Sequence, residues 1–431
     1  MKQILVINPG STSTKIGVFE NELQIHGVSL HHSTEELTKF TEISDQRWFR
    51  EKAIIDWLVE HSVNLDSLTA IVARGGLLCP IPSGTYAVNE AMVHDLELGL
   101  YGKHACNLAA LIAYDLSQKL NIPSFIVDPV VVDEMSPLAK ISGTPGIKRA
   151  SIFHALNQKA MAKKVAKILN RPYAELNLIV AHLGGGISIG VHQQGKVVDV
   201  NNALNGDGPF SPERTGTLPT TELIRYFFSK DFSTDTLIKR FSSKSGLVAH
   251  LGTNDSRVIV ERIQAGEEKA QFYFEAMAYQ IAKELGRAAA VLEGSIDSIV
   301  LTGGLAHSNK LTTLIKEYIE FLGPVIIMPG ENELKALALG ALRVLTGSER
   351  AAEYSPRGGE FMPKGRVIVH QERCKECSLC INSCPYSVLG FSKGINSKGF
   401  HPVEPMYPEK CTGCTLCAVI CPDVVLTIER I

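Results

Sequence analysis

The sequence predicts an α/β body followed by a small α+β domain that is rich in cysteine. Three observations carry this prediction. Short apolar runs alternate with helical periodicity from Met1 to about Leu345, glycine-rich turns follow three of those runs, and two four-cysteine runs occupy the tail. Alternating strands and helices form an architecture in which helices pack on sheets. Ligands bind such sheets at the carboxyl ends of the strands, where the glycine turns fall.

The composition narrows the class of protein. The chain has 431 residues, a length that favours two to three domains. Its formal net charge of −2 and the lack of a Lys/Arg-rich block argue against nucleic acid as a partner. No apolar stretch approaches the roughly 18 residues of a membrane span, and the N-terminus lacks a signal-peptide pattern. We therefore expect a cytoplasmic protein without a membrane partner, in which clustered cysteines bind metal rather than form disulfides.

The first part of the body begins with strands. Apolar runs at 4–7 and 15–19 flank a Gly/Ser/Thr turn and predict a hairpin, with a third strand at 24–30. Further strands are predicted at 69–73, which ends at Arg74, and at 125–127, which ends at Asp128. Helical spacing is found at 45–60 (with Asp45 as a possible cap), 90–98, 104–119 and 151–169.

The second part repeats the alternation. Strands are predicted at 177–183, 187–192, 196–200 and 298–301, and helices at 268–292 and 333–345. The body, 1–347, therefore has two lobes: about 1–175 with the C-terminal helix 333–346, and about 176–332. Residues 348–365 contain Pro, Gly and charge but little apolar periodicity, which predicts a linker to a module at 366–431.

Three glycine-rich turns in the body favour a nucleotide. The turn at 8–15 offers small residues, hydroxyls and a lysine, which suit a phosphate, although its spacing is not that of a Walker P-loop. Each turn could instead be a plain tight connection, but three at strand ends favour the nucleotide interpretation. The residues predicted to bind it are Asn8, Ser11, Ser13, Lys15, Gly184, Gly185, Gly186, Gly303 and Gly304.

Several segments of the body resemble one family. They are VINPGSTSTKIGVF, ARGG, YGKHACNLAALIAYDL, IVDPVVVDEMSP, AHLGGGIS and PGENELKALALGALRVL. From Met1 to about Thr346 the chain is similar to the acetate and butyrate kinase family, and to butyrate kinases in particular. That family belongs with sugar kinases, heat-shock ATPases and actin, so the resemblance implies a two-lobed, actin-like ATPase body of the acetokinase type. It also implies ATP/ADP, Mg²⁺, at least a homodimer, and reversible phosphorylation of a short-chain carboxylate (butyrate or a branched analogue) to the acyl phosphate.

The chemistry of that reaction fits the residue types. A carboxylate acceptor is already ionised at pH 7, since its unperturbed pKa is about 4 to 5, and needs no general base. This agrees with Asn8, where the superfamily's alcohol kinases and ATPases typically have an aspartate. The reaction does need positive charge between two anions. Arg74 can hold the carboxylate in bidentate geometry, and the resemblance adds His104 beside it, Arg214 as a charge on the phosphoryl group, and His182 as its hydrogen-bond donor.

Magnesium is the metal expected in the body. Mg²⁺ usually keeps several waters and takes one or two carboxylates, and Asp128 at a strand end is the natural, catalytic contact. The resemblance puts a second acidic residue near the C-terminal helix. Glu331 is favoured there, with Glu333 as the alternative.

The tail carries the motif C-x-x-C-x-x-C-x-x-x-C-P twice. This spacing is the signature of bacterial two-cluster ferredoxins, in which the fourth cysteine of each run binds the other run's cluster. Zinc competes for C-x-x-C pairs, but two complete runs favour iron–sulfur. The prediction is two [4Fe–4S] clusters, one held by Cys374, Cys377, Cys380 and Cys421, the other by Cys411, Cys414, Cys417 and Cys384.

The tail also suggests a partner. The segment from Gly365 to Pro405 resembles the small ferredoxin-type subunit of 2-oxoacid:ferredoxin oxidoreductases, which make acyl-CoA upstream of an acyl kinase. We expect subunits of such a complex as partners. The alternative is an electron-transfer subunit whose kinase-like body is an inactive scaffold, and the retention of Asn8, Arg74, His182 and Arg214 argues against it.

Overall fold

The computed structural model describes residues 1–229, 232–356, 365–384, 386–411 and 413–430. Two compact units make up the chain, Met1–Ser355 and Pro356–Ile431. Within the described ranges, no helix has both the length and the apolar character that crossing a bilayer requires.

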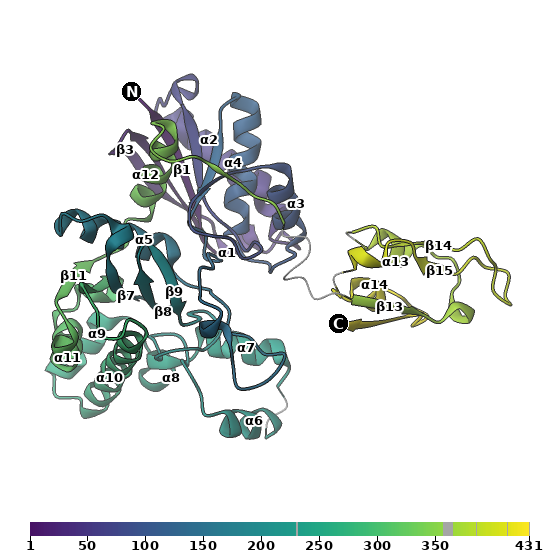
Figure 1. The fold of residues 1–431 in the computed structure, drawn as a ribbon. Helices are drawn as coiled ribbons and strands as arrows, with labels where there is room; N and C mark the ends of the chain where they lie inside the picture. The colour runs from purple at the N-terminus through teal and green to yellow at the C-terminus, as the bar shows by residue number, and fades with distance from the viewer. Residues whose placement is uncertain (230–231, 357–364, 385, 412, 431) are drawn as a thin grey trace. The chain divides into compact units, whose positions relative to one another are not determined.

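The first lobe of the larger unit is built on a seven-stranded sheet (Figure 1). In spatial order its strands are β12 (Ala352–Glu353), β5 (Thr85–Ala87), β6 (Ser124–Val127), β4 (Ala70–Arg74), β1 (Gln3–Pro9), β2 (Ser13–Glu20) and β3 (Leu23–His31). Strands β1, β4 and β6 run parallel, whereas β1, β2 and β3 form antiparallel pairs. The predicted hairpin and third strand are confirmed.

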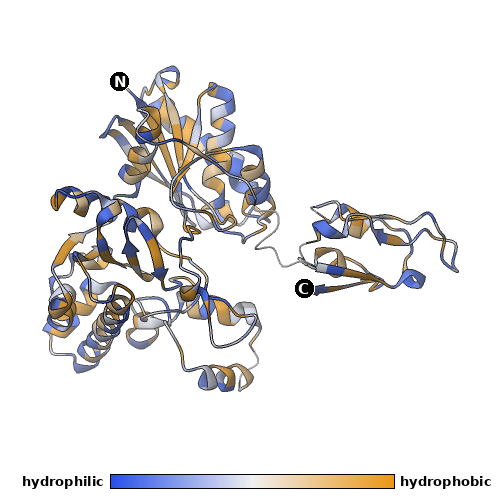
Figure 2. Ribbon diagram, viewed as in Figure 1, coloured by the Kyte–Doolittle hydropathy of each residue, from blue (hydrophilic) through white to orange (hydrophobic). Residues whose placement is uncertain are grey.

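Both faces of this sheet are covered, as the alternation of its side chains requires. Leu5 and Ile7 face the helices α2 (Arg47–Glu60) and α4 (Asn107–Leu120), whereas Ile4 and Val6 face α12 (Glu333–Leu345). Apolar strands lie at the centre of the lobe and polar segments outside (Figure 2). A central strand buried on both faces is typical of parallel sheets between helices.

Two helix starts in this lobe differ from the prediction. Asp45 does not cap α2: a 3-10 turn, Ser44–Gln46, precedes the helix, and the Asp45 carboxylate accepts from the Glu42 amide at 3.0 Å. The helix predicted at 104–119 begins at Asn107. The shorter helices α1 (Thr34–Leu37) and α3 (Glu90–Leu98) complete the lobe.

The second lobe has a five-stranded sheet. Its order is β11 (Val325–Pro329), β10 (Ser298–Gly303), β7 (Asn177–Leu183), β8 (Ile187–Gln193) and β9 (Lys196–Val200). The strands β7, β10 and β11 are parallel, and β8 and β9 add an antiparallel edge. The remaining helices are α5 (Ala155–Ile168), α6 (Thr220–Phe228), α7 (Thr234–Ser243), α8 (Gly246–Leu251), α9 (Ser256–Gln264), α10 (Glu268–Val291) and α11 (Asn309–Ile319).

Helix α5 packs on the second sheet, although the sequence assigned its residues to the first lobe. Its Ala162 and Val165 contact Leu178 and Val180 of β7, while α10 and α11 cover the opposite face. The lobe boundary near residue 175 is therefore misplaced for this helix. The reason is that α5 supplies the apolar cover that a parallel sheet needs on its second face.

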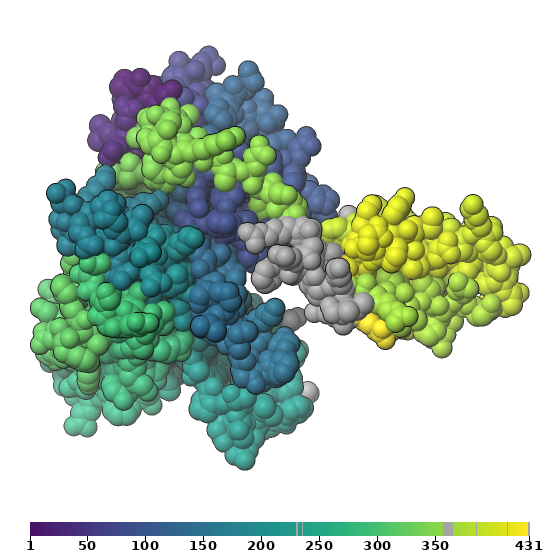
Figure 3. All heavy atoms as spheres, in the orientation of Figure 1, coloured from purple at the N-terminus to yellow at the C-terminus, as the bar shows by residue number. Residues whose placement is uncertain are grey.

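The chain after α12 does not leave the larger unit where the linker was predicted. Residues 352–353 form β12 beside β5, and the buried Tyr354 donates its hydroxyl to Asp95 at 2.6 Å. Glu349 accepts from the Thr85 amide at 2.8 Å. This segment runs over the surface of the first lobe (Figure 3). The predicted linker 348–365 is thus wrong for 348–355, and 357–364 lie outside the described residues.

The smaller unit repeats one pattern twice. Strand β13 (Gly365–Val369) pairs with β16 (Leu426–Arg430), and β14 (Leu389–Phe391) pairs with β15 (Val403–Pro405). Short helices α13 (Leu379–Asn382) and α14 (Leu416–Val419) follow a residue in the left-handed region, Ser378 or Thr415. This is the small α+β domain that the sequence predicted.

Candidate active site and cysteine centres

The glycine turns of the second lobe lie together at the carboxyl ends of β7, β10 and β11. Gly330 donates its amide to the Gly303 carbonyl at 2.9 Å. Gly303 has a φ of 88°, and a Cβ there would lie 2.4 Å from the Leu183 carbonyl oxygen. Only glycine allows this approach between neighbouring strand ends. Gly304, by contrast, has open space around it.

The turn between β1 and β2 is held from behind by a buried arginine, Arg50 of α2. Its guanidinium donates to the carbonyls of Gly10 at 2.8 Å, Ser11 at 2.9 Å and Ser13 at 3.0 Å. Arg50 is fully buried, and burial lowers its pKa to about 10. The carbonyls are thereby drawn inward, which leaves the predicted phosphate turn with a fixed backbone and exposed Ser11 and Lys15 side chains.

Two carboxylates before and at the start of α12 connect to opposite lobes. Glu333 pairs with Arg74 at 3.0 Å and accepts from the Asn8 amide group at 2.6 Å, both in the first lobe. Glu331 pairs with Nε2 of His182 at 3.0 Å, in the second lobe. The hydrogen bond from His182, together with the charges of Arg74 and Lys15, lowers the pKa of Glu331. The segment 331–333 therefore brings Asn8, Arg74 and His182 to one region.

Arg214 lies directly against the triple-glycine turn. A Cβ on Gly186 would come 2.1 Å from Nη1 of Arg214, so a larger residue there would displace this guanidinium. Arg214 donates to the Ala203 carbonyl, while its buried Nε has no partner among the described residues. Burial lowers the pKa of Arg214. An arginine held in this way, with an unused donor, is suited to bind an anion.

Two histidines of the second lobe, His154 and His182, stack on each other. The rings of His154 and His182 are 3.7 Å apart between centroids, with 11° between their planes. His182 is bonded at both nitrogens, through Nε2 to Glu331 and through Nδ1 to Asn157 at 2.9 Å. Nε2 of His154 has no hydrogen-bond partner in the described part of the chain. Burial, with the positive charges of His182, Arg214 and Arg74, holds the pKa of His154 well below its usual range.

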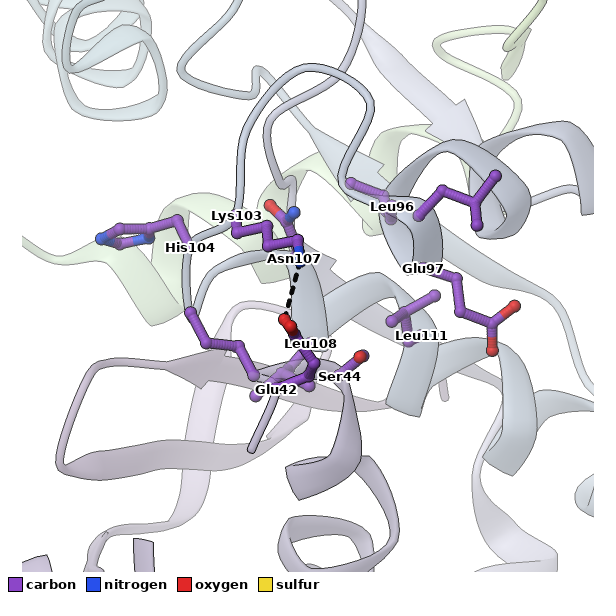
Figure 4. A pocket seen from close by; sticks show the side chains of 11 residues that line it. Glu42, Ser44, Leu96, Glu97, Lys103, His104, Asn107, Leu108 and Leu111 are labelled. Carbon is purple, nitrogen blue, oxygen red and sulfur yellow. Dashed lines mark hydrogen bonds and ion pairs between the residues drawn. The ribbon is translucent and has the colours of Figure 1, made fainter. Parts of the chain in front are cut away.

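His104 borders a pocket of about 240 Å³ in the first lobe. Figure 4 shows its ring pointing away from the leucines and the Lys103–Glu42 ion pair of 2.8 Å that line the pocket. Nδ1 of His104 accepts from the Cys106 amide at 3.2 Å. Burial, then the charges of Arg74 and Arg214, lowers the pKa of His104. His104 is therefore within electrostatic reach of both arginines.

Asp128 is placed differently from the other predicted groups. It ends β6 in the left-handed region, with a φ of 39°, and its Oδ1 accepts from the Ser83 hydroxyl at 2.6 Å and the Gly84 amide at 2.9 Å. No contact of the described residues joins it to Glu331. Nor does any group of three or more His, Cys, Asp or Glu side chains there form a ready site for a single metal ion. The positions of Asp128 and Glu331 in this structure do not form a shared magnesium site, and such a site stays a prediction.

Seven of the eight motif cysteines gather into two groups in the smaller unit. Four of them, Cys384, Cys411, Cys414 and Cys417, line one small cavity. Burial, then the thiols of Cys384, Cys414 and Cys411, raises the pKa of Cys417 to about 12. In the other group Cys380 is within electrostatic reach of Cys421 and Cys374. Cys377 is exposed, and Pro385 of the first motif lies outside the described residues.

Backbone amides point at three of these sulfurs. Val388 donates to Cys384 at 3.3 Å, Val425 to Cys421 at 3.3 Å, and Val403 to Cys374 at 3.4 Å. Amide donors to sulfur are the outer contacts that tune iron–sulfur clusters. Thiolates from both motifs around one cavity, with amide donors, fit a cluster.

Comparison with protein families agrees with both halves of this description. Residues 139–338 match the model of the Acetokinase family, and residues 373–425 match that of the 4Fe-4S dicluster domain. The chain carries an acetokinase-family domain and a 4Fe-4S dicluster domain. The dicluster match supports iron–sulfur clusters as cofactors.

Solved structures share the fold of the acetokinase-family domain. The acetate kinase of Porphyromonas gingivalis has a TM-score of 0.67 at 20% identity, over 80% of this chain and 100% of that one. A propionate kinase from Francisella tularensis subsp. tularensis SCHU S4 has a TM-score of 0.63 at 20% identity, over 79% and 99%. The acetate kinase of Entamoeba histolytica has 0.62 at 17%, over 79% and 98%. The predicted actin-like, acetokinase-type fold is confirmed.

Sequence reasoning missed three groups of the larger unit. His154 looked like one residue of a long helix, yet it precedes α5 and stacks on His182. Arg50 lies in the predicted helix 45–60 but was given no role. Glu333 was only the alternative to Glu331, but it is the carboxylate on Arg74. An unpaired positive charge among the apolar positions of α2 was the one signal that could have indicated Arg50.

Proposed function

We propose that this protein transfers the γ-phosphoryl group of ATP reversibly to a short-chain carboxylate, butyrate or a branched analogue, and so forms an acyl phosphate. One observation carries the proposal: Glu333 binds Arg74 of the first lobe at 3.0 Å and Glu331 binds His182 of the second lobe at 3.0 Å, so the segment 331–333 brings groups of both lobes together. Arg74 and Arg214, one cation from each lobe, suit an anionic acceptor and an anionic phosphoryl group. Phosphoryl transfer depends mainly on such positioning and charge.

The proposed roles follow from the hydrogen-bond donors that each group leaves unused. Arg74 makes one ion pair, to Glu333 through Nη1, and its remaining donors can hold a substrate carboxylate. Arg214 and Nε2 of His154 offer donors to the phosphoryl group. His182, bonded to Glu331 and Asn157, orients His154 by stacking. No residue needs to remove a proton, because the acceptor is ionised at neutral pH.

The nucleotide is proposed to lie against the three glycine turns. Asn8, Ser11, Ser13 and Lys15 form one turn, Gly184–Gly186 the next, and Gly303 with Gly304 the third. Mg²⁺ would accompany ATP as a counter-charge.

An acyl-phosphate assay on the purified full chain tests the proposal. Hydroxylamine trapping with ATP and acetate, propionate, butyrate or isobutyrate should give hydroxamate, most with the four-carbon acids. Each methylene contributes only about 1–3 kcal/mol of discrimination, so the shorter acids should still react. Arg74→Ala should lower kcat/KM at least about a hundredfold (about 2.7 kcal/mol). Absence of product from every acid, with a folded wild-type protein, would refute the proposal.

The smaller unit is proposed to carry electrons. The two cysteine groups would hold two [4Fe–4S] clusters, about eight iron atoms per chain by chemical analysis. We further propose a 2-oxoacid:ferredoxin oxidoreductase as the redox partner, because its acyl-CoA product leads to acyl phosphate. Co-purification without any subunit of such a complex would count against this partner. If hydroxamate never forms but the clusters reduce and reoxidise, the body is a scaffold for electron transfer.

A further inference from the structure

A chain of buried polar side chains lies behind His154. Tyr173 contacts Nδ1 of His192 at 2.7 Å, and Nε2 of His192 contacts Oε1 of Gln158 at 3.1 Å. The Gln158 amide nitrogen contacts the Ser188 hydroxyl at 2.9 Å, and that hydroxyl contacts Nδ1 of His154 at 2.9 Å. Gln158, His192 and Ser188 are fully buried.

The direction of every bond in this chain is determined by one backbone carbonyl. The side-chain nitrogen of Gln158 is also 3.0 Å from the Ser188 carbonyl oxygen, which can only accept. The NH₂ group must therefore face Ser188, and Oε1 must face His192. Gly190 makes the room for this, because a Cβ there would lie 2.2 Å from that Oε1.

The remaining protons follow by elimination. Oε1 of Gln158 accepts, so Nε2 of His192 donates and carries a proton. Burial holds the pKa of His192 well below its usual range, so this ring is neutral and its Nδ1 accepts from the Tyr173 hydroxyl. Both histidine nitrogens are then satisfied, as buried polar groups require.

The same logic determines the tautomer of His154. The Ser188 oxygen accepts from the Gln158 amide at 2.9 Å and from the His154 backbone N–H at 3.5 Å, which uses both of its lone pairs, and it has one proton of its own to donate. That proton points to Nδ1 of His154, which must accept it. The proton of a neutral His154 is therefore on Nε2, the nitrogen without a partner among the described residues.

We propose that Gln158, supported by His192 and Tyr173, is a positioning residue that holds His154 as the Nε2–H tautomer and so keeps this donor available for the phosphoryl group. The mechanistic use of that donor rests on the proposed function; the tautomer does not. In serine proteases, loss of the group that fixes the histidine tautomer lowers turnover severely. Here a glutamine–serine pair does the same work without a charge.

Nitrogen-15 NMR of histidine-labelled full chain with oxidised clusters tests the tautomer directly. His154 is assigned by the signals lost in His154→Gln. At neutral pH the wild type should show a protonated Nε2 and an unprotonated, hydrogen-bonded Nδ1. A proton on Nδ1 would overturn the proposal. If the tautomer is as expected but no acyl phosphate forms, the proposed function fails while the positioning role stands.

Gln158→Met tests the positioning role, because methionine keeps the length of glutamine without its amide. The Nδ1–H tautomer should appear, and kcat should fall at least about tenfold while both KM values stay within about threefold. Gln193→Met, at an exposed glutamine on β8, the strand of Ser188 and His192, is the matched control and should change neither. An unchanged tautomer and kcat in Gln158→Met would overturn the proposal.

Ser188→Ala keeps the proposal testable if Gln158→Met does not fold. The backbone carbonyl that binds Gln158 remains, and only the hydroxyl donor to His154 is removed. The Nδ1 signal of His154 should then move to the position of a nitrogen without a hydrogen bond. An unmoved signal would show that Ser188 is not the donor, which would overturn the assignment.

Discussion

Arg50 gives the sharpest test of how the phosphate turn is built. Replacement by methionine keeps an unbranched side chain of similar length in a fully buried position but removes every donor. The carbonyls of Gly10, Ser11 and Ser13 then lose their bonds of 2.8–3.0 Å to the guanidinium. The change also removes the donors to Oε1 of Gln46, at 2.9 and 3.1 Å, and to Oγ1 of Thr14, at 3.2 Å, so it tests all the contacts of this guanidinium together.

The expected loss can be worked from these contacts. A carbonyl left without a donor costs about 1–3 kcal/mol if it stays buried. Ser11 is exposed, so water can reach part of the turn, and we expect the low end, about 3 kcal/mol for the three groups together. This free energy can appear as lost stability or, if only the turn loosens, as weaker nucleotide binding of up to about a hundredfold.

Urea unfolding, monitored by tryptophan fluorescence, measures the loss of stability. Both tryptophans of the chain, Trp48 and Trp57, lie on α2, so fluorescence reports this lobe. The KM for ATP measures the weakening of nucleotide binding. Burial lowers the pKa of Arg50 to about 10, so the side chain is charged in both folded and unfolded states at pH 6 and pH 8. The loss should therefore be equal at these two values.

Arg47→Met is the matched control on the same helix. Arg47 pairs with Asp115 at 2.5 Å but is partly exposed, so its loss should cost about 1 kcal/mol or less. If Arg50→Met changes stability by less than about 1 kcal/mol and leaves the KM for ATP unchanged, the turn does not depend on this arginine.

Three further outcomes are expected. Gly186→Ala should lower kcat at least about tenfold with little loss of stability, because its Cβ would displace Arg214. Gly286→Ala is the control: the new Cβ lies in open space on α10, so this change should be neutral or stabilising in urea unfolding. Burial raises the pKa of Asp95, so the folded state holds this proton more tightly and stability should fall as pH rises just above about 4. Asp95→Asn should remove that decline, and an unchanged pH profile would contradict the assignment. Cys417→Ser should lower the iron content from about eight toward about four atoms per chain without changing acyl-phosphate formation, and loss of kinase activity would contradict this independence.

Elements with strong local patterns could be predicted from the sequence. The strands β7 and β9 and the helices α3 and α12 begin and end where expected, because their apolar periodicity continues to both ends. The region 201–267 received no prediction of helices or strands. Its helices α6 and α7 are short but clearly amphipathic, so their pattern was present in the sequence, whereas α8 spans only six residues.

The site was predictable only where function requires an unusual local sequence. The glycine turns, and Arg74 before a Gly-Gly pair, can be recognised in the sequence alone. Three other features could not be predicted, because each depends on residues far apart in the chain. They are the burial of Arg50, the stacking of His154 on His182 and the ion pair between Glu333 and Arg74. The packing of residues 348–355 was missed for the same reason: Tyr354 finds Asp95 only after the sheet has formed.

Two carboxylates, one on either side of Asn332, bind groups in different lobes. In the proposed function, a substrate carboxylate on the remaining donors of Arg74 lies beside Glu333 on the same guanidinium, so the two anions repel each other. Glu331, two residues earlier, binds His182 of the second lobe. A shift of Glu333 on binding of the acceptor would therefore reach the second lobe through the short segment 331–333. If the acceptor and ATP are coupled in this way, ATP must alter the binding of the carboxylate by the same factor as the carboxylate alters the binding of ATP.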